Sequence, residues 1–446
     1  MQEIKLTDVR YRPKYHIAAK SGWLNDPNGL VYFKGYYHVF FQHYPYDAVW
    51  GPMHWGHVRS KDLIHWETLP IALAPDQEDG CFSGSAIEYD GKLFLIYTAH
   101  YNLKEDGSKS YQEQNLAVSE DGINFTKYQG NPVIKPPLAN NTENFRDPKI
   151  WSDGQDFYCI IGGQTLDNRG QVLLYKSHDI YHWTFEKVLA TSKVSTVQGT
   201  MWECPDYFEI NGQKVLVVSP QGIEPDGEFY QNHHENGYFV GQEKEGNFIY
   251  PQNSFRELDR GHDFYAAQTL LAPDGRRILI AWLDMWEQKY HEQADGWAGM
   301  LSFPREITIE DGAVRMRPIR ELGKIRRETL LNESTAQGQY TFSSPCVEVQ
   351  FKAMQDLAFE FTRGFEKLSI SYQNGKFLLE KTGYKQRKIT WKMETLDVQI
   401  LSDASSIEIF IENGPVISER FYGEGDLELK FQSTKDVAVK TYRLEL

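Results

Sequence analysis

A two-stranded unit recurs five times along the first two thirds of the chain, and this repeat restricts the possible folds most. Each copy begins with a polar residue, crosses an apolar run, turns at a glycine and returns as a second apolar run. Glycine suits such turns because it adopts positive φ without steric cost. The turn glycines lie 56, 63, 58 and 63 residues apart, and they are Gly35, Gly91, Gly154, Gly212 and Gly275.

A second marker keeps the same spacing. The segments SKDLIHW, SEDGINF and SHDIYHW begin at Ser60, Ser119 and Ser177, which are 59 and 58 residues apart. Each predicts a turn into an outer strand. A period of about four strands is typical of a β-propeller, and the repeat number predicts five blades. Five unrelated hairpins would have no reason to keep two independent markers in step.

The amino-acid composition of the chain changes after about Arg317. All 13 histidines lie at or before His291, and ten of the 11 tryptophans lie at or before Trp297. We predict an all-β protein, a five-bladed β-propeller followed by a C-terminal β-sandwich. The propeller is expected over residues 1–318, a linker with a short helix over 319–330, and the sandwich over 331–446, where apolar alternation surrounds Asn-Gly turns.

Composition excludes several classes of partner. The net charge is −15 and no basic run is present, which argues against nucleic acid and anionic membranes. Nowhere do 18 apolar residues follow one another, so no membrane span is predicted. Four scattered cysteines favour a reduced, cytoplasmic protein. No nucleotide-binding glycine loop is present, and His54 and His57 are interpreted as structural, so we predict no cofactor and no metal.

The repeat predicts which polar residues meet in space. Equivalent ends of the innermost strands of a propeller gather at one mouth of its central channel. The residues that open the five units step by 57, 64, 56 and 60 positions. We therefore expect one funnel to be surrounded by Asp26, Ser83, Asp147, Glu203 and Asp263.

Four of these residues are acids, and three of them, Asp26, Asp147 and Glu203, stand out and suggest glycoside hydrolysis. That reaction needs one carboxyl as proton donor and another as nucleophile or base. Arg146 adjoins Asp147 and is expected to keep it ionised, whereas Glu203 has apolar neighbours and is the better candidate for a protonated acid. Asp26, among turn amides, is expected to remain an anion that can attack.

The motifs that carry these acids resemble those of glycoside hydrolase family 32. They are WLNDPNG, FRDP and WECPD, accompanied by FQHYP, FSGSA and DFYAAQT. The resemblance covers nearly the whole chain and implies a β-fructofuranosidase that works with retention. It implies that Asp26 is the nucleophile, that Glu203 is the acid/base, and that Asp147 binds sugar hydroxyls and stabilises the transition state.

The same resemblance implies a pocket for the terminal fructose. Trp286 and Trp282 compete for one wall of that pocket. The remaining members are polar or aromatic residues near the funnel mouth. The expected substrate-binding residues are Asn25, Gln42, Trp50, Phe82, Ser83, Arg146, Asp263 and Trp286.

Two other interpretations stay open at this point. One is a propeller that only binds carbohydrate, and the other is a five-bladed hydrolase of arabinan-type sugars. For the fructosidase, sucrose, sucrose-6-phosphate and short fructans are all candidate substrates. The expected partner is thus a small-molecule sugar, and the oligomeric state is left open.

Overall fold

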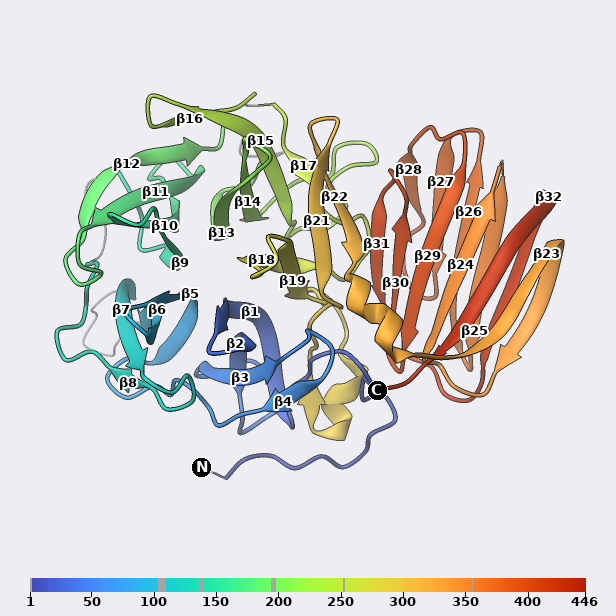
Figure 1. Ribbon diagram of the computed structural model, residues 1–446, viewed down its shortest axis with the longest axis horizontal. Helices are drawn as coiled ribbons and strands as arrows, with labels where there is room; N and C mark the ends of the chain where they lie inside the picture. The colour runs from blue at the N-terminus through green and yellow to red at the C-terminus, as the bar shows by residue number, and fades with distance from the viewer. Residues whose placement is uncertain (1, 103–109, 136–139, 194–197, 252, 355) are drawn as a thin grey trace.

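The computed structural model describes residues 2–102, 110–135, 140–193, 198–251, 253–354 and 356–446. Within these ranges, five antiparallel sheets form a wheel beside a ten-stranded sandwich (Figure 1). The predicted fold class is therefore confirmed. The described part of the chain contains no helix long and apolar enough to span a membrane.

Each of the first three blades is a four-stranded meander that starts at the centre of the wheel. Blade I is joined by one further strand from late in the chain. The strands of blade I are β1 (Gly22–Phe33), β2 (Tyr36–Tyr44), β3 (His54–Ser60) and β4 (Trp66–Thr68). Those of blade II are β5 (Gly80–Tyr89), β6 (Lys92–Tyr101), β7 (Tyr111–Ser119) and β8 (Thr126–Lys127). Those of blade III are β9 (Phe145–Ser152), β10 (Phe157–Gln164), β11 (Gly170–Ser177) and β12 (Thr184–Thr191).

The last two blades follow the same plan with small additions. Blade IV contains β13 (Met201–Ile210), β14 (Gln213–Gln221), β15 (Gly237–Lys244), β16 (Asn247–Ile249) and β17 (Arg256–Glu257). Blade V contains β18 (Tyr265–Leu271), β19 (Arg277–Trp282), β21 (Arg305–Glu310) and β22 (Ala313–Pro318). A 3-10 turn, η1 (His291–Asp295), and the short strand β20 (Trp297–Ala298) lie between β19 and β21.

The wheel is closed. The inner strands β1, β5, β9, β13 and β18 each contact the next, and β18 contacts β1. Strand β20 then pairs in parallel with the start of β1, joining Trp297 to Gly22. Residues from the end of the propeller thereby seal its first blade.

The predicted turns lie where the repeat places them. Each turn glycine sits at the tip of the hairpin between the two innermost strands of its blade. In the first hairpin Lys34 and Gly35 have φ of 46° and 85°, a pair of left-handed conformations that fits the twist of a hairpin. The second marker is also a turn before an outer strand, and in each copy an aspartate accepts backbone N–H groups.

Each inner strand is interrupted near the central channel. In blades I, III, IV and V, two residues of the inner strand lie opposite one residue of its neighbour, which is a β-bulge. Blade II has a one-residue irregularity between Phe82 and Gly84. Asp147, Cys204 and Ala266 sit in these bulges with φ of 65°, 46° and 53°. Such backbone is costly for residues other than glycine and is common at functional sites.

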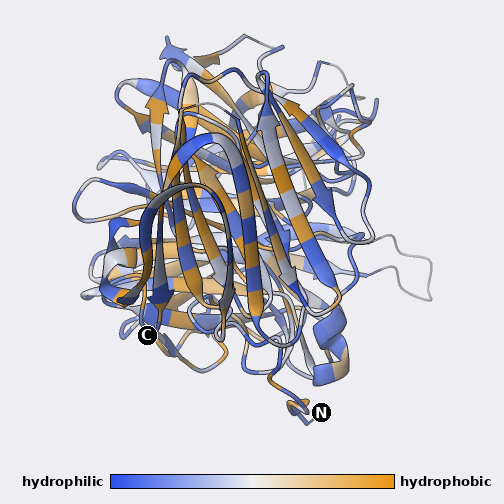
Figure 2. Cartoon of the chain, turned by 90° about the vertical axis from the view of Figure 1, so that its right-hand side faces the viewer, coloured by the Kyte–Doolittle hydropathy of each residue, from blue (hydrophilic) through white to orange (hydrophobic). Residues whose placement is uncertain are grey.

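The sandwich is one continuous hydrogen-bonded network folded into two layers. Its longest strand, β32, pairs with β25 through its first half and with β24 through its second half. The strands are β23 (Arg326–Phe342), β24 (Val347–Ala353), β25 (Leu357–Arg363), β26 (Glu366–Gln373), β27 (Lys376–Lys381), β28 (Arg387–Thr390), β29 (Leu396–Asp403), β30 (Ser406–Ile411), β31 (Val416–Arg420) and β32 (Leu427–Leu444). Hydrophobic and polar residues alternate along them (Figure 2), and the apolar set forms a separate core.

The connection between the domains is shorter than the expected 319–330 linker. A 3-10 turn, η2 (Arg320–Ile325), buries Leu322 and Ile325. Strand β23 then begins at Arg326, five residues before the expected start of the sandwich at 331. The apolar spacing that suggested a helix therefore serves one short turn, and the charged residues after it belong to a half-exposed edge strand.

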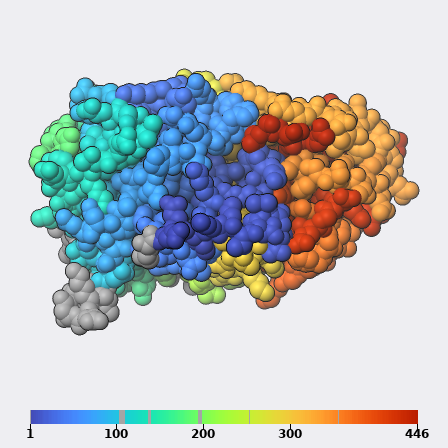
Figure 3. All heavy atoms as spheres, turned by 90° about the horizontal axis from the view of Figure 1, so that it is seen from below, coloured from blue at the N-terminus to red at the C-terminus, as the bar shows by residue number. Residues whose placement is uncertain are grey.

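A buried network of charged side chains lies between the two domains, and we call it the domain seam. Arg305 on β21 is fully buried, and its guanidinium donates to Asp259 at 3.0 Å and to Glu408 of the sandwich at 2.5 Å. Lys381 of the sandwich pairs with Asp263 at 3.0 Å. The N-terminal segment also lies against the sandwich (Figure 3), where His16 bonds Asp403 and Glu408, both at 2.8 Å.

Replacing Arg305 should therefore destabilise the whole protein. Arg305→Met leaves the buried carboxylate of Asp259 without a cation and leaves Glu408 with His16 alone, and such a loss costs about 4 kcal/mol. We expect a markedly lower free energy of unfolding in urea titration. The control Arg317→Met removes an exposed ion pair on the neighbouring strand and should cost less than about 1 kcal/mol. Equal stability of the two variants would show that the seam is not needed.

Candidate active site

Carboxyl groups from two blades contact the thiol of Cys204, and a third acid, Glu203, lies next to that cysteine in the chain. The Sγ of Cys204 lies 3.7 Å from Oδ2 of Asp26 and 3.6 Å from Oδ2 of Asp147. Glu203 precedes Cys204 on β13, while Asp26 lies on β1 and Asp147 on β9. Closure of the wheel thus brings together residues 178 positions apart in the chain.

The three acids do not occupy equivalent positions, contrary to the prediction. Glu203 is the last paired residue before its bulge, Asp147 is the first residue in its bulge, and Asp26 is the second. Because direction alternates along a strand, these one-residue offsets aim the three side chains differently. Because of these offsets, the three carboxyl groups can lie close together without overlapping.

Asp26 is held in a setting that resists ionisation. It lies among buried residues, and Ser83 donates to its Oδ2 at 3.1 Å. Burial raises the pKa of Asp26 to about 6, the Glu203 charge adds to this, and hydrogen bonds from Asn25 and Ser83 oppose it. Oδ1 of Asp26 is buried and accepts no hydrogen bond from the described residues.

Asp147 is fixed by its backbone as well as by its carboxylate. Its N–H donates to Thr98 Oγ1 at 2.9 Å, and its Oδ2 accepts from the N–H of Cys204 at 2.8 Å. Burial raises the pKa of Asp147 to about 7, against the opposing charge of Arg146. Arg146 therefore does not hold Asp147 firmly in its ionised form, contrary to the prediction.

Arg146 pairs instead with Glu203. Its Nε and Nη2 donate to Glu203 Oε1 at 3.0 and 2.8 Å, and Tyr265 donates to Oε2 at 2.5 Å. Burial raises the pKa of Glu203, but the Arg146 charge and these hydrogen bonds outweigh it and lower the pKa below its ordinary range. The prediction that apolar neighbours keep Glu203 protonated is thus wrong for the unliganded protein. The reason is that Arg146 and Asp147, being consecutive in a strand, point to different sides.

Several predicted sugar-binding residues line the same region. Asn25 and Gln42 are buried beside the blade I bulge, where Asn25 accepts from Trp23 at 2.8 Å. Trp50 is 48% exposed and meets Phe82 edge to face at 6.0 Å. A flat ring left open beside a polar pocket suits stacking against a sugar.

The structure separates the two competing tryptophans. Trp282 is fully buried, whereas Trp286 is only partly buried and stacks on Trp23 at 6.0 Å between ring centroids. Trp286 is therefore the one of the two that can meet a ligand.

Asp263 does not belong to this cluster. Its carboxylate is fully buried in the domain seam, where it accepts from Lys381 at 3.0 Å and from the N–H of Arg420 at 2.7 Å. The predicted role of Asp263 in sugar binding is not supported, because β18 begins two residues later, at Tyr265. Tyr265 takes the position before the bulge that Glu203 holds in blade IV. The spacing from Glu203 to Tyr265, 62 residues, could have identified it.

The histidines that could have suggested a metal site form hydrogen bonds with protein groups instead. His57 bonds His38 at 2.9 Å, and His54 bonds the carbonyl of Pro52 at 2.9 Å. Among the described residues, no group of three or more His, Cys, Asp or Glu could hold a metal ion. His234 bonds Glu287 at 2.5 Å, and its ring lies edge to face with Tyr265 at 5.9 Å.

The site defines a class of protein before any comparison. Buried carboxyl groups with pKa values pushed in opposite directions are what acid/base and nucleophilic roles in glycoside hydrolysis require. The flat rings and buried amides around them suit a sugar. The arrangement is that of a glycoside hydrolase.

Comparisons with known proteins agree. Residues 16–318 match the glycosyl hydrolases family 32 N-terminal domain, and residues 332–445 match the family 32 C-terminal domain. The chain belongs to glycoside hydrolase family 32. A sucrose-6-phosphate hydrolase of Escherichia coli is 38% identical over 452 residues, covering 96% of this chain and 93% of that protein. One of Zymomonas mobilis is 43% identical over 361 residues, covering 78% and 70%.

Solved structures extend the agreement to the fold. A Bombyx mori GH32 beta-fructofuranosidase matches with a TM-score of 0.91 and 39% identity, covering 98% of this chain and 95% of that chain. The sucrose-6-phosphate hydrolase from Lactobacillus gasseri matches with a TM-score of 0.88 and 28% identity, covering 98% and 93%. The predicted enzyme class, a fructosyl-releasing glycosidase, is confirmed, and the two alternative interpretations are not favoured.

The hydrogen bond from Tyr265 should set the pH profile. Tyr265→Phe removes a donor to Glu203, so the pKa of Glu203 rises, by about one unit for a bond of about 1.5 kcal/mol. With Glu203 as the predicted proton donor, the alkaline limb of kcat/KM should move to higher pH by about one unit. Tyr15→Phe, which alters a buried tyrosine in the domain seam, should leave the limb in place. An unmoved limb in Tyr265→Phe would show that this bond does not tune the donor.

Burial of Asp26 in the site should also lower the free energy of unfolding of the protein at neutral pH. The pKa of Asp26 rises from 3.8 to about 6 on folding, so the ionised form destabilises the folded state as pH rises through this range. Asp26→Asn should raise the free energy of unfolding by about 3 kcal/mol at pH 8, and the gain should vanish near pH 4. The control Asp206→Asn loses a carboxylate paired with Lys149 and should destabilise at pH 8. A pH-independent difference for Asp26→Asn would contradict the assignment.

Proposed function

We propose that this glycosidase removes terminal β-D-fructofuranosyl groups by double displacement with retention of configuration. The observation that carries the proposal is the proximity of Asp26, Asp147 and Glu203 at Cys204, where Arg146 and Tyr265 donate to Glu203 and to neither of the two aspartates. The roles of the three acids follow from this asymmetry together with the resemblance to the family.

In the first step Asp26 attacks the anomeric carbon of the fructosyl group. A bond forms between a carboxylate oxygen and that carbon, and the glycosidic bond breaks with its electron pair moving to the leaving oxygen. Glu203 gives that oxygen a proton. In the second step Glu203 takes a proton from water, the oxygen of that water attacks the same carbon, and the ester with Asp26 breaks.

Glu203 must be protonated before the first step, although Arg146 keeps its pKa low without a sugar. Arg146 is itself expected to bind the fructosyl group. Hydroxyls that occupy its guanidinium would weaken its bonds to Glu203, and a sugar that fills the pocket would exclude water. Both changes raise the pKa of Glu203, so binding of the substrate would prepare the acid.

Asp147 is proposed to bind sugar hydroxyls and to stabilise the positive charge that develops at the anomeric carbon. Its raised pKa makes it a strong acceptor that is poorly solvated. The backbone bonds to Thr98 and Cys204 would hold it at a fixed depth, where it cannot reach in to attack.

For the substrate we propose sucrose or sucrose-6-phosphate. Several relatives are named sucrose-6-phosphate hydrolase, one from Escherichia coli is named raffinose invertase, and a Bombyx mori relative has been solved in complex with sucrose. All four cysteines are free and buried, which supports a reducing, cytoplasmic setting in which a phosphorylated sugar is available.

The test measures release of fructose from sucrose, sucrose-6-phosphate and short fructans, and of arabinose from arabinan, by wild type and by Asp26→Asn. We expect release from the sucrose-type substrates, β-fructofuranose as the first anomer in NMR spectra, and a loss of at least about a thousandfold in Asp26→Asn. Asp153→Asn, which alters an exposed acid in the β9–β10 turn, is the control and should keep wild-type rates. Inversion, or a wild-type rate in Asp26→Asn, would contradict the proposal.

A further inference from the structure

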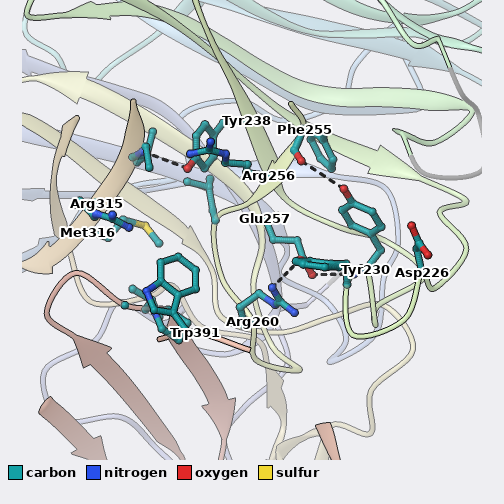
Figure 4. Close-up of a pocket in the computed structure, with 17 residues that line it drawn as sticks. Asp226, Tyr230, Tyr238, Phe255, Arg256, Glu257, Arg260, Arg315, Met316 and Trp391 are labelled. Carbon is teal, nitrogen blue, oxygen red and sulfur yellow. Dashed lines mark hydrogen bonds and ion pairs between the residues drawn. The ribbon is translucent and has the colours of Figure 1, made fainter. Parts of the chain in front are cut away.

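A cavity of about 450 Å³ lies between blades IV and V and the sandwich (Figure 4). Strands β15, β17 and β22 supply one side, and Trp391 with the turn before β31 supplies the other. None of the carboxyl groups at the catalytic funnel lines it. The cavity is large enough for a monosaccharide derivative.

Two arginines in this cavity lack the partners that other cations of the seam have. Arg305, Lys381, Arg420 and Arg260 are each paired with carboxylates. Arg256 and Arg315 form no ion pair with any residue that the structure describes. Arg256 is exposed and hydrogen-bonds the carbonyl of Gly312, at 3.3 Å, and the side chain of Tyr238. Nε of Arg315 is buried with no hydrogen-bond partner among the described residues.

Both guanidinium groups act electrostatically on the same phenol. Burial raises the pKa of Tyr238, and both Arg256 and Arg315 act to lower it. The Tyr238 hydroxyl also accepts from the N–H of Val314 at 3.1 Å, which fixes it at the cavity wall. Arg256 is exposed and Arg315 is half-buried, and neither guanidinium is neutralised by a carboxylate of the described residues.

Aromatic rings complete the lining. Arg315 lies over the ring of Trp391 at 5.7 Å, and Trp391 is held by a bond from its Nε1 to the carbonyl of Asn413 at 2.9 Å. Phe229 on the opposite side is 44% exposed. An aromatic face beside guanidinium groups suits a ligand that has both a ring and an anionic group.

The acids of the cavity do not cancel this charge. Glu257 is paired with Arg260 at 3.2 Å. Asp226 lies at the exposed edge, on the side away from Arg315 and Trp391 (Figure 4). The free positive charge is therefore confined to the part of the cavity that Arg256, Arg315 and Trp391 form.

We propose that this cavity is a second ligand site, separate from the catalytic funnel, which binds a sugar phosphate. Arg256 and Arg315 bind the phosphate, and Trp391 stacks on the sugar ring. Guanidinium groups match phosphate oxygens in geometry and charge. The inference goes beyond the hydrolysis itself and does not depend on it.

The test is isothermal titration calorimetry of the full chain with glucose 6-phosphate, inorganic phosphate and glucose. We expect glucose 6-phosphate to saturate one site, phosphate to bind more weakly, and glucose to give no signal. The double variant Arg256→Gln/Arg315→Gln should weaken glucose 6-phosphate about a hundredfold, about tenfold for each charge-assisted contact. Trp391→Ala should weaken glucose 6-phosphate and leave inorganic phosphate unchanged.

Arg317→Gln is the matched control. It removes an arginine from the same strand, β22, that is already paired with Glu412, so binding should be unchanged. Wild-type protein that does not bind glucose 6-phosphate at millimolar concentration would overturn the proposal. Binding that persists in the double variant would place the ligand elsewhere, including the catalytic funnel, and would overturn it equally.

Hydrolysis separates this inference from the proposed function. The double variant should keep the wild-type kcat and kcat/KM on sucrose, because neither arginine contacts the catalytic carboxyl groups. Loss of sugar-phosphate binding with normal hydrolysis supports the second site. Failure of Asp26→Asn to lose hydrolysis would count against the proposed mechanism and leave the cavity unaffected.

Discussion

The paired hydrogen bonds from Arg146 to Glu203 are the interaction on which the site depends. Three carboxyl groups are buried against one another, and like charges at this distance cannot all ionise freely. One guanidinium supports one full negative charge, so Glu203 stays ionised while the pKa values of Asp26 and Asp147 rise. A sugar that draws Arg146 toward its own hydroxyls would redistribute protons among these groups.

The fold makes this arrangement possible by combining closure with irregularity. Closure of the wheel places β1, β9 and β13 around one channel, and the bulges turn side chains toward it at three different depths. The strained backbone of Asp147 and Cys204 is held by the sheets on either side. The sandwich then fixes the wheel from outside through Arg305 and Lys381, whose partners lie in both domains.

The sequence revealed what depends on periodicity and missed what depends on single-residue register. The spacing of Gly35, Gly91 and the other turn glycines was enough to predict five blades, and the acid motifs were enough to predict which acids meet. The spacing between the repeated units varies by several residues, however. It could not show that Asp263 lies before the start of β18, or that Tyr265 takes the position expected for Asp263. Likewise, the adjacency of Arg146 and Asp147 in sequence suggested an ion pair between them. Because side chains alternate in direction along a strand, Arg146 pairs with Glu203 instead. Such choices are made by tertiary contacts between blades.

The most direct test of this account is to trap the ester that Asp26 is proposed to form. Glu203→Gln lacks the base of the second step, so a substrate with a good leaving group should let the fructosyl-enzyme accumulate. After an acid quench and proteolysis, mass spectrometry should find one anhydrohexose on the peptide that contains Asp26. The same mass on the peptide containing Asp147, or no adduct during a measured burst of leaving-group release, would contradict the account.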